Sequence, residues 1–279
     1  MSVHSDAAGA AGTMGMAETT LQAEANGLSI GCSIRGSGPP LILIHGAEAD
    51  RTMFSALGAA LAPRYTVIAY DQRDSGLTQD LASPPRPYGL ADLADDAASL
   101  TAVLGYEKAH VFGTSLGGHI AQVLAARHPA RIDRLVLGST WLAGLDLKAV
   151  SPETARQLMA WRADVGRHAA DIAGLFFTAS HLRAHPERID LFRGGRRTAE
   201  QVARRAALLG VPYPILPGEI AAPALLFMGE RDGLIPNAAT MAVASLLREP
   251  RVEVMAGVGH IAAIEAPSIL AGLITAFLG

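Results

Sequence analysis

The chain has 279 residues, of which 50% are hydrophobic and 18% are charged. This balance predicts a globular protein with a substantial core and excludes a globally disordered chain. The net charge of −3 argues against a protein that binds nucleic acid non-specifically. A single cysteine, Cys32, excludes an intrachain disulfide framework and fits a reducing compartment.

The N-terminal residues 1–18 are rich in alanine and glycine. They have neither the basic segment nor the continuous apolar segment of a signal peptide. No stretch of the chain is apolar over the ~18 residues that a membrane span needs. We therefore expect a disordered tail, or a start-site extension, on a cytoplasmic protein without a membrane partner.

Strand and helix patterns alternate through the first half of the chain. The predicted strands are 21–25, 28–35, 41–44, 65–70, 109–112 and 135–138. The predicted helices are 51–61, 90–104 and 116–127. Asn26-Gly27 is a strong signal for a hairpin between the first two strands, and the all-apolar run 41–44 is typical of a strand buried on both faces.

The alternation stops near Trp141, and the pattern is helical from there to about residue 218. It resumes with a strand at 224–229, a helix from Asn237, a strand at 252–255 and a last helix at 267–278. Repeated alternation predicts an α/β protein with a mainly parallel, doubly wound sheet. We expect a core of residues 19–140 and 219–279, and a helical cap of residues 141–218 over the carboxyl ends of the strands.

Gly113-Thr114-Ser115-Leu116-Gly117 lies between the predicted strand that ends at Phe112 and the helix that follows. A serine flanked by glycines at a strand-to-helix turn indicates a nucleophile elbow, in which the turn is too tight for larger neighbours. A serine hydroxyl is nearly inert at neutral pH, so this interpretation requires a histidine and a carboxylate elsewhere.

Candidates for both partners follow the last two strands. His260 follows the strand that ends at Met255, in a glycine-containing loop, and Asp232 follows the strand 224–229. Glu230 is a nearby alternative to Asp232, which would otherwise cap the next helix, and His260 would otherwise be a solvated loop residue.

This arrangement resembles the α/β-hydrolase family, in which the nucleophile, the acid and the histidine occur in this chain order. The resemblance runs from about Leu21 to the end of the chain and includes His45-Gly46 after the strand 41–44. It implies that His260 is the general base for Ser115 and that Asp232 orients the imidazole.

The resemblance also implies an oxyanion hole formed by the backbone N–H groups of Ala47 and Leu116. His45 would shape that loop without acting as a base, and we expect His119, on the helix after the elbow, to pack. No metal and no cofactor are implied.

One loop departs from the family pattern. The family has D-x-R-G-x-G after the strand 65–70, whereas this chain has Asp74 at the first glycine position. We expect a structural loop in which Arg73 and Asp71 pair. Glu48, Asp50 and Arg51 follow the predicted oxyanion loop and either line the pocket mouth or are solvated.

The predicted cap carries 11 basic and 7 acidic side chains, a formal charge of +4, against −7 for the rest of the chain. A basic cap would attract a carboxylate-bearing substrate, unless its arginines lie on solvated helix faces. Glu48, Trp141, Trp161 and Phe176 are the candidate pocket residues, although packing within the cap explains the aromatic residues equally well.

We expect a serine hydrolase, monomeric or homodimeric, that cleaves a small carboxylic ester or lactone through an acyl-enzyme. Carbon–carbon bond hydrolases, perhydrolases and cofactor-free lyases share such a triad and remain alternatives. A haloalkane dehalogenase is disfavoured, because that family has a carboxylate at the position of Ser115. A small-molecule receptor of this fold is the non-enzymatic alternative.

Overall fold

The computed structural model describes residues 17–194, 197–208, 211 and 213–279. The predicted tail, residues 1–18, lies outside this part of the chain except for Ala17 and Glu18. Glu18 accepts a hydrogen bond from Arg35 at 2.9 Å, directly before the first strand begins.

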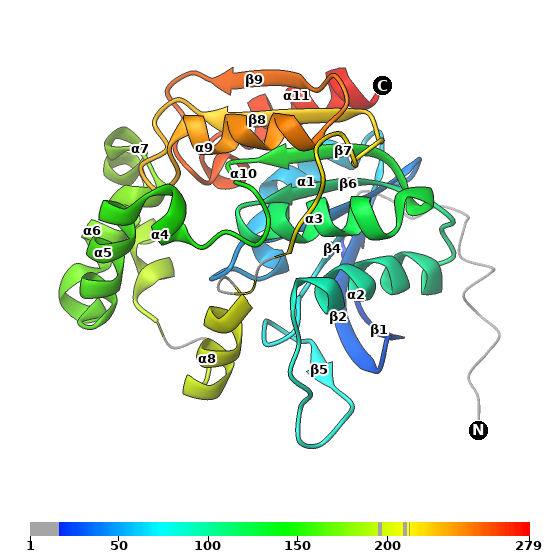
Figure 1. The fold of residues 1–279 in the computed structure, drawn as a ribbon, viewed down its shortest axis with the longest axis horizontal. Coiled ribbons are helices and arrows are strands. Elements are labelled where there is room, and N and C mark those ends of the chain that lie inside the picture. Colours follow the sequence, from blue (N-terminus) through cyan, green and yellow to red (C-terminus); the bar gives the residue numbers. More distant parts are fainter. Residues whose placement is uncertain (1–16, 195–196, 209–210, 212) are drawn as a thin grey trace.

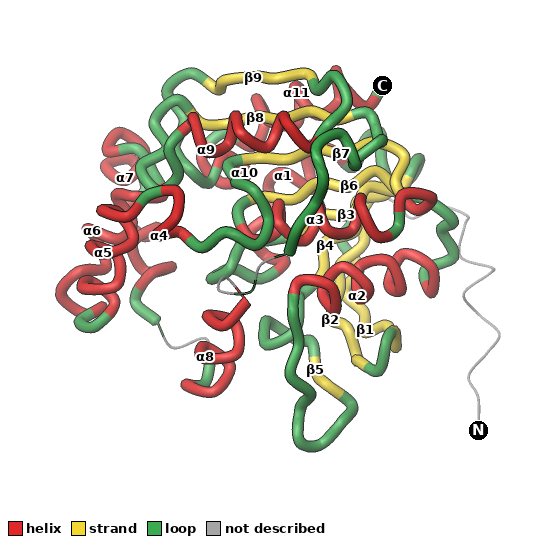
Figure 2. Tube along the Cα trace, in the orientation of Figure 1, coloured by secondary structure: helices red, strands yellow, loops and turns green. Residues whose placement is uncertain are grey.

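The described residues form a 9-stranded sheet with helices on both faces (Figures 1 and 2). Its strands are β1 (Thr19–Ala25), β2 (Leu28–Arg35), β3 (Pro40–Ile44), β4 (Thr66–Tyr70), β5 (Gln79–Asp80), β6 (Ala109–Thr114), β7 (Ile132–Gly138), β8 (Ala224–Gly229) and β9 (Arg251–Met255). The strand order is β1-β2-β4-β3-β6-β7-β8-β9, and β5 pairs with β2.

Neighbouring strands from β4 to β9 run parallel, whereas β2 pairs antiparallel with β1, β4 and β5. Leu41 to Ile44 of β3 are fully buried, as the apolar run predicted. The mainly parallel, doubly wound sheet expected from the alternation of elements is thereby confirmed.

Two helical layers cover the sheet. On one face α2 (Leu90–Val103), α3 (Leu116–Arg127) and α9 (Asn237–Ala242) pack over a core that includes Ile42, Val111 and Leu226. On the other face α1 (Ser55–Leu61), α10 (Ala262–Glu265) and α11 (Pro267–Leu278) pack over Leu43, Phe112 and Leu225. Successive strand residues thus point into different layers, as the alternation of side chains along a strand requires.

Residues 147–207 contain the helices α4 (Leu147–Val150), α5 (Pro152–Arg162), α6 (Val165–Phe176), α7 (Ala179–Ala184), η3 (Pro186–Phe192) and α8 (Ala199–Ala207). Their apolar side chains form a third cluster, in which Phe176 and Phe192 meet Leu234 and Ile261 from loops at the carboxyl ends of strands. Figure 1 shows the arrowheads of β7 and β8 directed toward α4 to α7. We call residues 141–218 the cap from here on.

Short elements account for the differences from the predicted secondary structure. The predicted helix 51–61 is a 3-10 turn, η1 (Arg51–Phe54), followed by α1, because Asp50 caps the turn through the N–H of Thr52 and Phe54 leaves helical geometry. The two-residue β5 and the four-residue α10 were not predicted, since elements of that length carry no periodic signal.

No helix among the described residues has the length and apolar character that crossing a bilayer requires.

Candidate active site

Ser115 occupies a strained turn between β6 and α3. Its φ of 55° and ψ of −124° lie outside the regions that side chains readily adopt. A Cβ on Gly113 would lie well inside 3.0 Å of the carbonyl oxygen of Gly117, and one on Gly117 would meet the carbonyl oxygen of Ile44 equally closely. The two glycines therefore allow α3 to leave the sheet directly after Ser115, as a nucleophile elbow requires.

His260 and Asp232 form a buried pair beside this turn. The imidazole Nδ1 lies 2.8 Å from Oδ2 of Asp232, and the two side chains are 2% and 1% exposed. The other carboxylate oxygen accepts hydrogen bonds from the N–H groups of Leu234 and Ile235, each at 2.9 Å. The carboxylate is thus held in place and accepts a hydrogen bond from the Nδ1–H group, which leaves the lone pair of His260 on Nε2.

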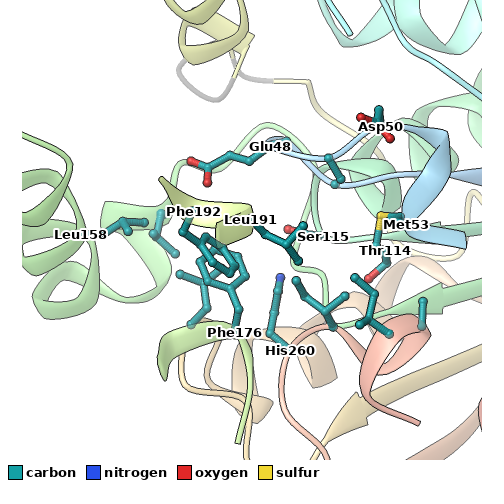
Figure 3. Close-up of a pocket in the computed structure, with 18 of the residues that line it drawn as sticks. Glu48, Asp50, Met53, Thr114, Ser115, Leu158, Phe176, Leu191, Phe192 and His260 are labelled. Atoms are coloured by element: carbon teal, nitrogen blue, oxygen red, sulfur yellow. The ribbon is translucent and has the colours of Figure 1, made fainter. Parts of the chain in front are cut away.

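Nε2 of His260 is buried and has no hydrogen-bond partner within the described part of the chain. Figure 3 shows the ring directed from the cavity wall toward Ser115. A buried imidazole nitrogen without a partner, beside a serine at a strained elbow, has the arrangement of a base that awaits the serine proton.

Glu230, the alternative acid, is placed elsewhere. It is exposed, and its carboxylate accepts a hydrogen bond from the N–H of Gly257 at 2.9 Å. The structure brings Asp232, and not Glu230, to His260.

The loop that carries His260 is fastened to the end of α6. The carbonyl oxygen of Phe176 accepts hydrogen bonds from the N–H groups of His260 at 2.9 Å and Ile261 at 3.3 Å. The carboxylate of Glu265 accepts from the N–H of Gly259 at 3.0 Å on one side and from the hydroxyl of Thr178 on the other. The position of the imidazole therefore depends on the cap as well as on the sheet.

The loop after β3 lies directly against the elbow. A Cβ on Gly46 would be 3.5 Å from Cβ of Ser115. The N–H groups of Ala47 and Leu116 have no hydrogen-bond partner among the described residues. Leu116 opens α3, where the helix dipole also favours negative charge. Two unpaired donors close to a serine hydroxyl are the components of an oxyanion hole.

His45 orients this loop. Burial lowers the pKa of its imidazole to about 3, so the ring is neutral. Its Nε2 accepts from the N–H of Gln72 at 3.2 Å, and the proton is therefore on Nδ1, which donates to the carbonyl oxygen of Gly46 at 2.8 Å. Because Gly46 and Ala47 share one peptide plane, this bond also fixes the direction of the Ala47 N–H.

The expected pairing of Arg73 with Asp71 is wrong. Asp71 pairs with Arg51, which brings Arg51 inward and away from the pocket mouth. Arg73 instead forms a bidentate pair with Asp96 on α2, at 2.7 and 2.8 Å. Each of the two side chains thus meets a partner from a different element, Arg51 of η1 for Asp71 and the buried Asp96 of α2 for Arg73.

Asp74, at the glycine position of the family pattern, has a left-handed φ of 58°. Its carboxylate receives two hydrogen bonds from Arg204 on α8, at 2.7 and 2.8 Å, and one from Tyr88 at 2.8 Å. These partners hold the pKa of Asp74 below its usual value against the opposing effect of burial. The aspartate at this position is thus a docking point for the cap.

A cavity of about 560 Å³ opens above Ser115 and His260, between the sheet and the cap (Figure 3). Its inner wall is mainly apolar and includes Leu158, Phe176, Leu191 and Phe192. Charged side chains also line it, namely Glu48, Asp50, Asp146, Lys148, Arg162 and Arg188. The volume and the mixed lining are typical of a site for a small organic ligand.

Three of the four predicted pocket residues, Glu48, Trp141 and Phe176, line this cavity. Trp161 does not: its ring stacks on His168 of α6, with centroids 6.2 Å apart. The reason is helical periodicity, because α5 turns Ala155, Leu158, Met159 and Arg162 toward the cavity and Trp161 away from it.

Leu158, Leu191 and Phe192 were not identified from the sequence. The i, i+3, i+4, i+7 spacing of the cavity face of α5 is the signal that would have found Leu158. Nothing local marks the residues of η3.

His119 packs, as expected. It is fully buried, its ring meets that of Trp141 edge-on with centroids 4.3 Å apart, and neither ring nitrogen has a hydrogen-bond partner among the described residues.

Within the same part of the chain, no three His, Cys, Asp or Glu side chains gather as ligands for a metal ion.

Known proteins that are similar to this chain include hydrolases and an esterase. A 2-(acetamidomethylene)succinate hydrolase of Mesorhizobium japonicum is 28% identical over 255 residues, which cover 88% of this chain and 89% of the relative. A putative carbamate hydrolase, RutD, of Yersinia enterocolitica is 28% identical over 79% of this chain and 80% of its own length. A thermophilic esterase from Thermogutta terrifontis superposes with a TM-score of 0.75 at 27% identity, over 94% of this chain and 98% of that one.

The family model for the alpha/beta hydrolase fold matches residues 39–267, a range that contains the elbow serine, the buried acid–histidine pair and the intervening cap. This chain belongs to the alpha/beta hydrolase fold family.

Proposed function

We propose that this protein is a serine hydrolase that cleaves a small carboxylic ester or lactone through an acyl-enzyme intermediate. The observation that carries the proposal is the buried Asp232–His260 pair, whose unpartnered Nε2 lies on the same cavity wall as Ser115. A nucleophile, a base and an orienting carboxylate in this relation are the components of acyl transfer.

The chemistry follows from these positions. Nε2 of His260 takes the proton of Ser115 as the hydroxyl oxygen attacks the substrate carbonyl carbon. The N–H groups of Ala47 and Leu116 stabilise the oxyanion that forms. His260 then donates its proton to the departing alcohol oxygen, which leaves an acyl group on Ser115. Water that His260 deprotonates releases the acid and regenerates the serine.

The cavity supports a substrate of modest size with an apolar part. Its inner wall of Leu158, Phe176, Leu191 and Phe192 suits an acyl or alcohol chain. The similarity to a thermophilic esterase at 27% identity supports an ester substrate.

Cleavage of a C–N bond is the second candidate. Two relatives that align over 79% or more of this chain are named as a 2-(acetamidomethylene)succinate hydrolase and a putative carbamate hydrolase. The same serine, histidine and donors would attack an amide-type carbonyl by the same steps, with nitrogen as the leaving atom.

The test is a fluorophosphonate label with peptide mapping, followed by turnover of p-nitrophenyl esters, lactones and amides. We expect Ser115 to be the labelled residue, and Ser115→Ala to lower kcat for the best ester by about 10⁴-fold or more while the melting temperature stays near that of the wild type. Labelling at another residue, or turnover retained by Ser115→Ala, would refute the mechanism. Amides that are cleaved faster than esters would favour the second candidate.

A further inference from the structure

Arg205, on the cap helix α8, is 5% exposed although it carries a charge. Its guanidinium donates to the carbonyl oxygen of Ala47 at 3.1 Å, to that of Arg73 at 2.8 Å and to the side-chain oxygen of Gln72 at 3.0 Å. One cap side chain thereby joins the loop after β3 to the loop after β4.

With this contact, the peptide groups on both sides of Ala47, the residue that supplies the proposed oxyanion donor, are held by hydrogen bonds. On one side, the peptide plane that contains the Ala47 N–H is held by His45 through the carbonyl oxygen of Gly46. On the other side, the next peptide plane is held by Arg205 through the carbonyl oxygen of Ala47. Two fixed planes leave the backbone of Ala47 without freedom to turn its N–H away from Ser115.

Docking of α8 does not by itself account for a buried arginine here. The adjacent Arg204 already ties α8 to Asp74, and Arg197 donates to the carbonyl oxygens of Asp74 and Ala49, each at 2.7 Å. Burial disfavours the charged form of Arg205 and lowers the pKa of its guanidinium to about 10. An apolar side chain would fill the same space without this free-energy cost of desolvation, but it would leave the three acceptors without a donor.

We propose that Arg205 is a positioning residue of the oxyanion hole, holding the Ala47 N–H in the direction of the Ser115 hydroxyl through its hydrogen bond to the Ala47 carbonyl oxygen. The inference rests on the proposed function of Ser115 as a nucleophile. It assigns to the cap a part in transition-state stabilisation, in addition to enclosing the substrate.

The experiment compares Arg205→Gln and Arg205→Lys with Arg204→Gln, a neighbour on α8 that contacts Asp74 and not the oxyanion loop. Each variant is measured for kcat and KM on the best ester, for the rate of fluorophosphonate labelling, for inhibition by a trifluoromethyl ketone that forms an oxyanion on Ser115, and for melting temperature. Arg205→Lys keeps the charge and a single donor group in place of the branched guanidinium, and it is the variant to interpret if Arg205→Gln does not fold.

We expect Arg205→Gln to lower kcat by about 10- to 100-fold, less than the complete loss of a donor, with KM within about twofold. The trifluoromethyl ketone should bind more weakly by the same factor as kcat/KM falls. Arg205→Lys should lie between Arg205→Gln and the wild type, and Arg204→Gln should stay within about threefold of the wild type.

The proposal is overturned if folded Arg205 variants keep the wild-type kcat, if KM alone changes, or if Arg204→Gln loses as much activity as Arg205→Gln. In each of these cases wild-type labelling at Ser115 shows that the proposed function stands. If the wild type itself is not labelled at Ser115, the proposed function fails and this inference fails with it.

Discussion

His119 shows how a single residue beside the elbow makes the stability of the fold depend on pH. Its imidazole is fully buried against Trp141, and burial lowers its pKa to about 3 from the ordinary 6.5. The folded protein therefore keeps this ring neutral at pH values where the unfolded chain binds a proton. Stability rises with pH wherever the unfolded state binds more protons, so this contribution is complete above pH 6.5 and is lost as the pH falls toward 3.

Between pH 7 and pH 5, His119 alone should lower the free energy of unfolding by about 2 kcal/mol. His119→Leu, which has no titrating group and removes no hydrogen bond, should lose about 2 kcal/mol less over the same interval. Urea unfolding of both proteins at the two pH values measures the difference. Equal losses in the two proteins would show that His119 is protonated in the folded state.

At the scale of elements, the contact between α3 and β3 depends on one helical glycine. Gly117 faces the carbonyl oxygen of Ile44 with no room for a Cβ, whereas Gly174, within α6, has nothing within 4 Å of the same position. Two glycines in helices therefore have opposite consequences when a methyl group is added.

Gly117→Ala should lower the free energy of unfolding by about 1–3 kcal/mol, because the helix must shift against the sheet. Gly174→Ala should raise it by about 0.5–1 kcal/mol, which is the difference in helix propensity. Chemical denaturation of the two variants tests both signs. A stable, fully active Gly117→Ala protein would contradict the tight elbow described above.

Elements with local signals were predictable, and those fixed by distant contacts were not. Ser115 and Asp232 each follow a buried strand, His260 follows a strand of which only the last residue is buried, and all three lie near glycine or turn residues, so their positions at one edge of a parallel sheet could be inferred. The orientation of Trp161 and the contacts of Arg205 depend on how the cap helices dock. Docking is decided by side chains far apart in the chain, and a single sequence does not show which of them meet.

At the scale of the whole molecule, much of the positive charge of the cap is used to attach it to the core. Arg204 pairs with Asp74, Arg162 pairs with Glu48 across the cavity, and Arg205 binds main-chain oxygens. Other cap arginines, such as Arg156 in α5 and Arg193 directly after η3, pair with acids three residues earlier in the chain. This use of the arginines favours cap docking over attraction of an anionic substrate as the reason for the basic composition.

The Arg162–Glu48 pair is about half exposed, so salt should weaken it. Raising the ionic strength from 0.05 to 0.5 M should speed hydrogen exchange in α5 by about twofold to fivefold, the equivalent of one exposed ion pair. Exchange in α11, which packs on the far face of the sheet, should not change. Arg162→Met should show the faster exchange of α5 at both salt concentrations, and an equal salt response of α5 and α11 would contradict this account.

One end of the cap is tied to the loop that carries His260, and this limits how the cap can move relative to the sheet. The ties are the hydrogen bonds from His260 and Ile261 to Phe176, and the carboxylate of Glu265 between Gly259 and Thr178. Lifting that end of the cap would carry the imidazole away from the nucleophile. An opening that keeps His260 beside Ser115 must therefore leave the end of α6 in place. Parting of the half-exposed Arg162–Glu48 contact, by contrast, would loosen the cavity lining without breaking the hydrogen bonds that hold His260.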